Sequence, residues 1–158
     1  MDNCGCLLKG AVHDLASREK FGAIRELLTK ANQQSEIREI KNLEMAVLNR
    51  EKEQSTGVGQ GVAIAHGKTE FAKKPLVLLG ISRHGIHYDS PDGKPVHLLF
   101  IIANHPNYQQ EYITVLSAIA RLVNNSCFRQ TLLALKQPAE VEARLASILN
   151  RLPEPQLA

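Results

Sequence analysis

A glycine-rich stretch that ends in a histidine holds the residues of this sequence best suited to chemistry. It runs Ser55-Thr-Gly-Val-Gly-Gln-Gly-Val-Ala-Ile-Ala-His-Gly67, with three glycines at alternate positions. Glycine lacks a side chain and permits positive φ, so this backbone can approach a ligand closely and direct several N–H groups at an anion. Val62 and Ile64 alternate like residues of a half-buried strand, which would deliver His66 beside the loop. A flexible connection with a chance histidine is the plainer alternative.

His66 is itself a candidate nucleophile. An unperturbed imidazole has a pKa near ~6.5, so a neutral nitrogen is available at cytosolic pH. Such a nitrogen can attack a phosphoryl group and carry it as a phosphoramidate, chemistry that depends mainly on position and charge compensation. Backbone N–H groups of the glycine loop would supply donors, and Arg50 would offer a bidentate fork to phosphate oxygens. The simpler explanation of Arg50 is a cation at a helix C-terminus, which the helix dipole favours.

Other kinds of site fit the sequence less well. The Gly-x-Gly-x-Gly spacing differs from the dinucleotide fingerprint, its glycines precede a strand-like run, and no Gly-Lys-Ser/Thr loop occurs. Ser55 and Cys127 lack the surroundings of a serine or cysteine nucleophile. His84 and His87 are separated by Gly85, which argues against a helix that would aim both at one metal. These patterns predict neither nucleotide binding nor acyl transfer.

The remaining metal candidate lies at the N-terminus. Cys4-x-Cys6 with His13 would supply three ligands, whereas structural zinc sites usually have four. We therefore expect no metal and no cofactor. The three cysteines form no disulfide framework, which fits a reducing cytosol and predicts a cytoplasmic protein.

Length and composition predict one globular domain. The chain has 158 residues, of which 44% are hydrophobic and 22% charged, values ordinary for a soluble protein. The net charge of +3 is spread without a basic stripe and aromatic residues are only 4%, so no nucleic-acid partner is expected. No apolar run approaches the ~20 residues of a membrane span, and no secretory signal is evident, so we expect no direct membrane insertion.

Hydrophobic periodicity places helices around a central group of strands. Apolar residues recur at helical spacing most clearly from Tyr112 to Val123. Two almost wholly apolar runs, 76–81 and 96–103, are typical of strands buried on both faces. The pattern predicts an α/β sandwich in one domain. The predicted helices cover about 17–31 with Ser17 as N-cap, about 36–53, about 112–123, a short segment capped by Ser126, and a segment from Pro138 to Leu152.

Three segments together resemble a known family. They are Leu48-Asn-Arg-Glu-Lys52, the stretch from Ser55 to Lys68, and Asp92-Gly-Lys-Pro-Val-His-Leu-Leu-Phe100. They resemble the fructose/mannitol-type IIA proteins of the phosphoenolpyruvate-dependent phosphotransferase system, and within that group the stand-alone nitrogen-regulatory IIA proteins. The resemblance implies a mixed β-sheet of about five strands with helices on both faces. It runs over a domain at 15–152, between an N-terminal tail at 1–14, expected to be flexible, and a C-terminal tail at 153–158.

The resemblance also implies roles for single residues. The phosphorylated histidine of the family corresponds to His66, its active-site arginine to Arg50, and its second active-site histidine to Tyr112. Ala65 replaces the usual proline and Gln54 the usual glycine, changes that we expect to be tolerated. Tyr112 bears on the efficiency of phosphotransfer rather than on the fold. The expected phosphate-binding loop consists of Ser55, Thr56, Gly57, Gly59 and Gly61.

The partners implied by the resemblance are proteins. A histidine-containing phosphocarrier protein would donate the phosphoryl group, and a IIB component or a regulatory target would receive it or respond to it. The alternative is a regulatory interaction module that keeps the IIA fold without transferring phosphate. Tyr112 and Ala65 favour that alternative, whereas His66, Arg50 and the glycine loop favour the carrier. The sequence leaves open whether the output is sugar uptake or regulation.

Overall fold

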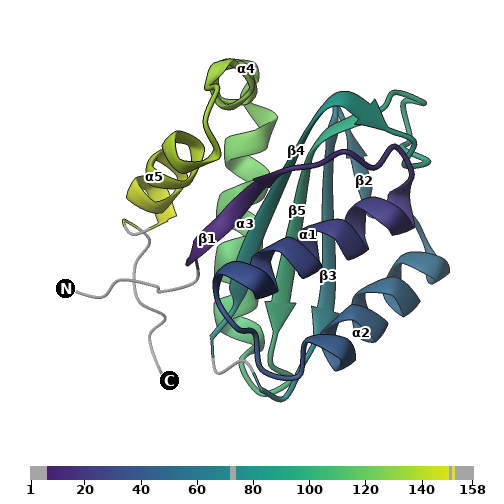
Figure 1. The fold of residues 1–158 in the computed structure, drawn as a ribbon, viewed down its shortest axis with the longest axis vertical. Coiled ribbons are helices and arrows are strands. Elements are labelled where there is room, and N and C mark those ends of the chain that lie inside the picture. Colours follow the sequence, from purple (N-terminus) through teal and green to yellow (C-terminus); the bar gives the residue numbers. More distant parts are fainter. Residues whose placement is uncertain (1–6, 72–73, 150, 152–158) are drawn as a thin grey trace.

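A mixed five-stranded sheet forms the centre of a computed structural model, which describes residues 7–71, 74–149 and 151 (Figure 1). The first two helices precede most of the sheet in the chain, and the last three follow it. In chain order the elements are β1 Leu7–Asp14, α1 Lys20–Gln34, α2 Ile40–Glu53, β2 Gly57–Gly59, β3 Val62–Lys68, β4 Leu76–Ile86, β5 Val96–Asn104, α3 Gln109–Asn124, α4 Ser126–Ala134 and α5 Pro138–Leu149.

Strand pairing fixes the position of the candidate histidine. The strand order is β1-β4-β5-β3-β2. β3 pairs in parallel with β5 and antiparallel with β2, so it is an interior strand. β4 pairs in parallel with β1 and antiparallel with β5. The register sets His66 opposite Ile102 of β5, near the C-terminal end of β3.

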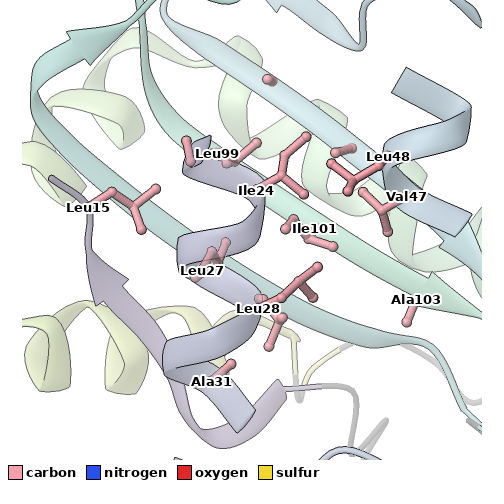
Figure 2. Close-up of a cluster of buried hydrophobic side chains, with 14 of the residues drawn as sticks. Leu15, Ile24, Leu27, Leu28, Ala31, Val47, Leu48, Leu99, Ile101 and Ala103 are labelled. Atoms are coloured by element: carbon pink, nitrogen blue, oxygen red, sulfur yellow. The ribbon is translucent and has the colours of Figure 1, made fainter. Parts of the chain in front are cut away.

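Helices cover both faces of the sheet, as its almost uninterrupted apolar strands require. α1 and α2 pack on one face (Figure 2), in a cluster that includes Ile24, Leu27, Leu28, Val47, Leu48, Leu99 and Ile101. α3, α4 and α5 pack on the opposite face, in a cluster that includes Val62, Ile64, Phe100, Ile102, Val115, Ile119, Leu132, Val141 and Leu145. The predicted α/β sandwich with a mixed five-stranded sheet is confirmed.

The N-terminal segment corrects one expectation. Residues 7–14, expected to be part of a flexible tail, form β1 and pair in parallel with β4. Ala11 and Val12 are buried, and the N–H of Ala11 donates to the Glu142 carboxylate of α5 at 2.8 Å. The apolar stretch is short and contains Gly10 at a φ of 78°, which hides its strand character in the sequence. The rest of the expected tails lies outside the described residues, namely 1–6, which contains Cys4 and Cys6, and 153–158.

The first two helices begin later than predicted. α1 begins at Lys20, because Glu19 before it is extended, with φ −116° and ψ 146°. Ser17, the expected N-cap, lies in the preceding loop, where its N–H donates to the Glu26 carboxylate at 2.8 Å. α2 begins at Ile40 rather than near residue 36. Glu39 has a φ of 56°, in the left-handed region, and a right-handed helix cannot continue through that conformation.

Two further boundaries differ from prediction. β4 continues to Ile86, beyond the predicted end at Ile81, because an irregularity in the ladder lets it resume pairing with Val96. The cap of α4 is Asn125 rather than Ser126, since its side chain accepts the N–H of Phe128 at 3.2 Å. These changes extend elements without altering the layers.

Candidate functional site

His66 lies where β3 meets the start of α3. Ile64 and His66 are two residues apart on the strand, so both face the layer formed by the last three helices. The ring of His66 is half-buried, with its centroid 5.9 Å from that of Tyr112 in the first turn of α3. The planes of the two rings are inclined by 47°. The structure thus brings together two residues that are far apart in the sequence.

The surroundings of His66 favour its neutral form. Burial lowers the pKa of His66, and the positive charge of Arg50 lowers it further. A hydrogen bond with the backbone of Ile64 and the charge of Glu51 act in the opposite direction without reversing the net shift. An imidazole with a lowered pKa keeps an unprotonated nitrogen at neutral pH, which is the form needed for nucleophilic attack.

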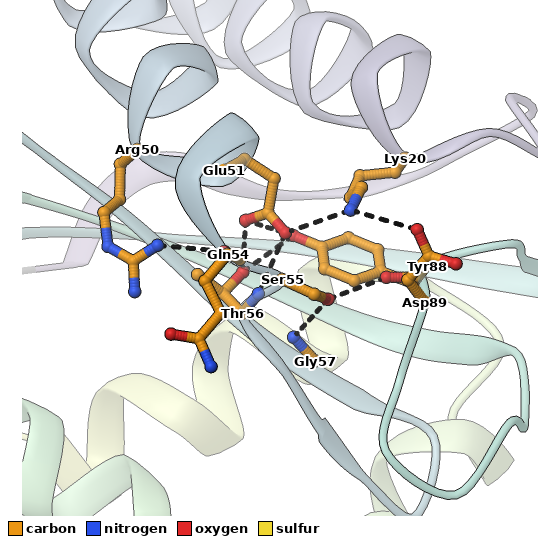
Figure 3. A network of polar contacts seen from close by, with 9 residues as sticks. All are labelled: Lys20, Arg50, Glu51, Gln54, Ser55, Thr56, Gly57, Tyr88 and Asp89. Atoms are coloured by element: carbon orange, nitrogen blue, oxygen red, sulfur yellow. Dashed lines mark hydrogen bonds and ion pairs between the residues drawn. The ribbon is translucent and has the colours of Figure 1, made fainter.

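Arg50 acts on His66 from the helical layer on the opposite face of the sheet. It lies in the last turn of α2, is half-buried, and donates from Nη1 to the Gln54 carbonyl at 2.9 Å (Figure 3). Its charge acts on both His66 and Tyr112, although burial keeps the pKa of Tyr112 above the usual value. A guanidinium has five N–H donors, so the bond to Gln54 leaves others for a ligand.

The glycine after the histidine allows this approach. A Cβ atom at Gly67 would lie 2.8 Å from the backbone nitrogen of Val47 and 2.8 Å from its Cγ2. That distance is too short for any side chain, so α2 packs directly on the β3 backbone beside His66. Arg50 lies one turn beyond Val47 on the same helix. Gly67 therefore helps to bring the guanidinium to the site.

Ser55 and Thr56, expected in a phosphate-binding loop, are hydrogen-bonded within the protein. The Ser55 hydroxyl donates to the carbonyl of Tyr88 at 2.8 Å and accepts the N–H of Gly57 at 3.2 Å. The Thr56 hydroxyl donates to the Glu51 carboxylate at 2.5 Å (Figure 3). Both hydroxyls and the Gly57 N–H are thus engaged within the protein and fix the segment between α2 and β2.

Gly59 and Gly61 also differ from expectation. They have φ values of 90° and 79°; Gly59 ends β2, and Gln60 and Gly61 form the hairpin turn that leads into β3. Gly61 is five residues before His66 on an extended strand, roughly 16 Å away. Their backbone donors cannot reach a phosphoryl group on that histidine, so these glycines shape the hairpin.

The structure contains a buried polar network beside the site that the sequence did not predict. The side chain of Glu51 is fully buried. Its carboxylate accepts hydrogen bonds from the N–H of Thr56 at 2.9 Å and from the hydroxyl of Tyr88 at 3.2 Å (Figure 3). Lys20 of α1 forms an ion pair with it at 3.5 Å. Burial and the Glu51 charge hold the pKa of Tyr88 far above its usual range, so this phenol stays a donor.

One sequence signal could have revealed Glu51. It follows Leu43 and Val47 at intervals of four residues, which places it on the buried face of α2. Lys20 and Tyr88 come from distant segments, and no local pattern connects them to it.

Most of the chain matches a known protein family. The family described as "Phosphoenolpyruvate-dependent sugar phosphotransferase system, EIIA 2" matches residues 10–148. The chain belongs to this family. It is therefore a IIA-type, phosphotransferase-class carrier protein, as its motifs predicted. In the described part of the chain, no helix is long and apolar enough to cross a membrane.

Relatives with sugar and with nitrogen-regulatory names are about equally similar. The chain is 35% identical over 131 residues to the fructose-specific EIIA component of Haloferax volcanii, covering 83% of this chain and 85% of that one. It is 32% identical over 132 residues to a nitrogen regulatory protein of Bradyrhizobium diazoefficiens, covering 84% and 86%. It is 33% identical to the fructose-specific EIIABC component of Bacillus subtilis over 87% of this chain, but spans only 21% of that protein.

Solved structures share the fold. The nitrogen regulatory protein IIA-Ntr of Neisseria meningitidis superposes with a TM-score of 0.79 at 30% identity, covering 92% of this chain and 97% of the other. The mannitol IIA protein of Escherichia coli, solved in complex with phosphorylated enzyme IIB, superposes with a TM-score of 0.67 at 19% identity, covering 90% and 97%.

The backbone at Gln54 does not require a glycine. Gln54, where a glycine is usual, has a φ of −163°, an extended conformation open to any residue. Ala65 is buried and pairs with Ile101 inside the sheet.

Proposed function

We propose that His66 accepts a phosphoryl group from a histidine-containing phosphocarrier protein. The supporting observation is the convergence on one half-buried, neutral imidazole of the Arg50 guanidinium from α2 and the Tyr112 phenol from α3. A ring nitrogen of His66 attacks the phosphorus of the donor's phosphohistidine. A new N–P bond forms as the donor's N–P bond breaks, and its electron pair stays on the donor nitrogen.

Arg50 supplies the charge compensation. The phosphoryl group brings negative charge into a half-buried place where the expected loop donors are engaged or distant. Guanidinium is suited to two phosphate oxygens at once. The phosphorylated state of this protein therefore depends mainly on Arg50.

Tyr112 contributes a hydrogen bond without a charge. Its pKa is raised by burial, so the phenol remains protonated and neutral at pH 7. A second imidazolium at this position would add a positive charge opposite the phosphate, and Tyr112 cannot. This difference makes the phosphoryl group less well compensated than in relatives with two histidines.

An exposed apolar side chain beside the site fits a protein as the source and destination of the phosphoryl group. Ile113, next to Tyr112 on α3, is 50% exposed. Surfaces that dock proteins combine apolar side chains with a polar rim. The names of the relatives suggest a IIB component or a regulatory target as the next partner.

A mass measurement distinguishes this function from that of a module that only binds partners. Tyr112 in place of a second histidine favours the binding module. The protein is incubated with phosphoenolpyruvate, the first enzyme of the system and the phosphocarrier protein, and then weighed intact. We expect a gain of one phosphoryl group that requires all three components. No gain, with a related IIA protein labelled in parallel, would favour the binding module.

A further inference from the structure

The Glu51 carboxylate is more strongly held than the proposed function requires. Its side chain is fully buried, and its two oxygens accept from the backbone N–H and hydroxyl of Thr56 and from the hydroxyl of Tyr88 (Figure 3). Lys20 lies 3.5 Å away with the opposite charge. A buried carboxylate is costly unless it is paired and hydrogen-bonded, so these four contacts specify one position for it.

Two contacts tie the end of α2 to the segment that follows it. Glu51 accepts the N–H of Thr56 at 2.9 Å, and its neighbour Arg50 donates to the carbonyl of Gln54, also at 2.9 Å. The guanidinium is therefore anchored to a segment that the carboxylate holds in place. Movement of Thr56 away from Glu51 would move the anchor of Arg50.

The same segment is bonded to the strand that carries the histidine. The carbonyl of Thr56 accepts the N–H of Ile64 at 3.1 Å, two residues before His66. We propose that Glu51 is a positioning residue, whose carboxylate holds the guanidinium of Arg50 in place opposite His66. This inference rests on the proposed function and deepens it, because it concerns the geometry of the same transfer.

The acceptor chemistry of a carboxylate suits this task. One N–H, two hydroxyls and an ammonium converge on Glu51, and a carboxylate presents only acceptors to them. A glutamine would turn an NH₂ donor toward one of these donors and leave Lys20 without its buried partner. The end of α2 would then shift, and a displacement of about 1 Å at a reacting centre can slow a reaction about a hundredfold.

Glu51→Gln tests the inference, with Glu26→Gln as a matched control. Glu26 also joins a helix to a loop, by accepting the N–H groups of Ala16 and Ser17, but it lies on α1 outside the proposed site. Both variants should be less stable to urea. Under conditions in which both are folded, only Glu51→Gln should accept the phosphoryl group more slowly, by roughly tenfold to a hundredfold.

Two further readouts separate positioning from stability. In an Arg50→Lys background, Glu51→Gln should add little, because the guanidinium that it positions is already gone. The slowing should also persist at alkaline pH. The Glu51 charge raises the pKa of His66, so its removal lowers that pKa and cannot make the histidine less neutral.

Thr56→Val provides a second variant in case Glu51→Gln does not fold. It removes the hydroxyl that bonds Glu51 while keeping a similar shape, so acceptance should be slower than in Thr56→Ser, which retains the bond. A wild-type rate in Glu51→Gln or in Thr56→Val, additive losses with Arg50→Lys, or equal slowing in Glu26→Gln would overturn the inference. A wild-type protein that takes up no phosphoryl group would instead overturn the proposed function.

Discussion

At the scale of single residues, the site rests on the relation between Arg50 and His66. Before transfer, the guanidinium disfavours a second positive charge and so helps to keep the imidazole neutral. After transfer, the same guanidinium would face a negatively charged phosphoryl group. Arg50 thus favours both the neutral, reactive form of His66 and the phosphorylated product. Substitutions that change the charge or the shape of Arg50 should therefore change phosphoryl acceptance.

The first prediction concerns the titration of His66. Burial and Arg50 lower its pKa, so the ring should remain neutral as the pH falls through ~6.5, the unperturbed value, and should protonate only below it. Arg50→Ala removes one of the lowering causes, so the midpoint should move to higher pH than in the wild type. Titration of the ring protons by NMR measures both. A wild-type midpoint at or above ~6.5 would contradict the account.

The second prediction concerns the shape of the cation. Arg50→Lys keeps the charge but loses the planar fork, and Arg50→Ala loses both. Phosphoryl acceptance should fall in that order, with the alanine variant slower by roughly a hundredfold. Lys52→Ala is the control, because Lys52 is an exposed cation in the same last turn. If all three variants label equally fast, Arg50 is only a helix-end cation.

The third prediction concerns Tyr112. Tyr112→Phe removes one hydrogen bond to a charged group, worth at most about 1.5–3 kcal/mol, and should slow acceptance without unfolding the protein. Tyr112→His should be faster than the wild type, because an imidazolium adds the missing charge. Rates and phosphoprotein lifetimes are measured for both. A phenylalanine variant identical to wild type in rate and lifetime would make Tyr112 a packing residue.

At the scale of elements, the site depends on how closely α2 lies against β3. Gly67→Ala would place a Cβ 2.8 Å from the Val47 backbone nitrogen, so the helix must move, at a cost of about 1–3 kcal/mol. Urea unfolding should show that loss, and phosphoryl acceptance should slow as Arg50 is displaced. Gly22→Ala on α1 is the control, since it meets only the side chain of Ser17. Equal rates of phosphoryl acceptance in both variants would show that the close contact of α2 with β3 is not needed for phosphoryl acceptance.

The sequence predicted elements with strong periodicity and missed those fixed by distant contacts. The apolar spacing of α3 was sufficient to place Tyr112 near the start of a helix. β1 was missed because its stability comes from pairing with β4, which a short local pattern does not reveal. The start of α2 was misplaced because nothing in the local sequence marks the left-handed conformation of Glu39.

The residues of the candidate site were likewise predictable only in part. Motif resemblance pointed to His66, Arg50 and Tyr112; in the structure Tyr112 lies in ring contact with His66, and the charge of Arg50 acts on it. The position of the glycine loop was not predictable, because glycine spacing shows that a backbone turns but not where the turn lies relative to His66. The Glu51 network could not be predicted as a unit, since its members come from separate elements.

At the scale of the whole molecule, His66 lies on the sheet between the two helical layers. α2 covers one face and α3 the other, and β3 lies in the interior between β5 and β2. The chain has six histidines, and among the described residues His66 is the one influenced by Arg50 and in ring contact with Tyr112. We therefore expect one histidine of the six, His66, to carry the phosphoryl group.

Mapping the phosphoryl group on the labelled protein shows which histidine carries it. The label should be lost in acid and kept in alkali, as a phosphoramidate is, and should map to the peptide that contains His66. His66→Ala should take up none. His97→Gln, which alters another half-buried histidine, bonded to the Ser82 carbonyl at 2.8 Å, should label like the wild type. Undiminished labelling of His66→Ala would contradict the account.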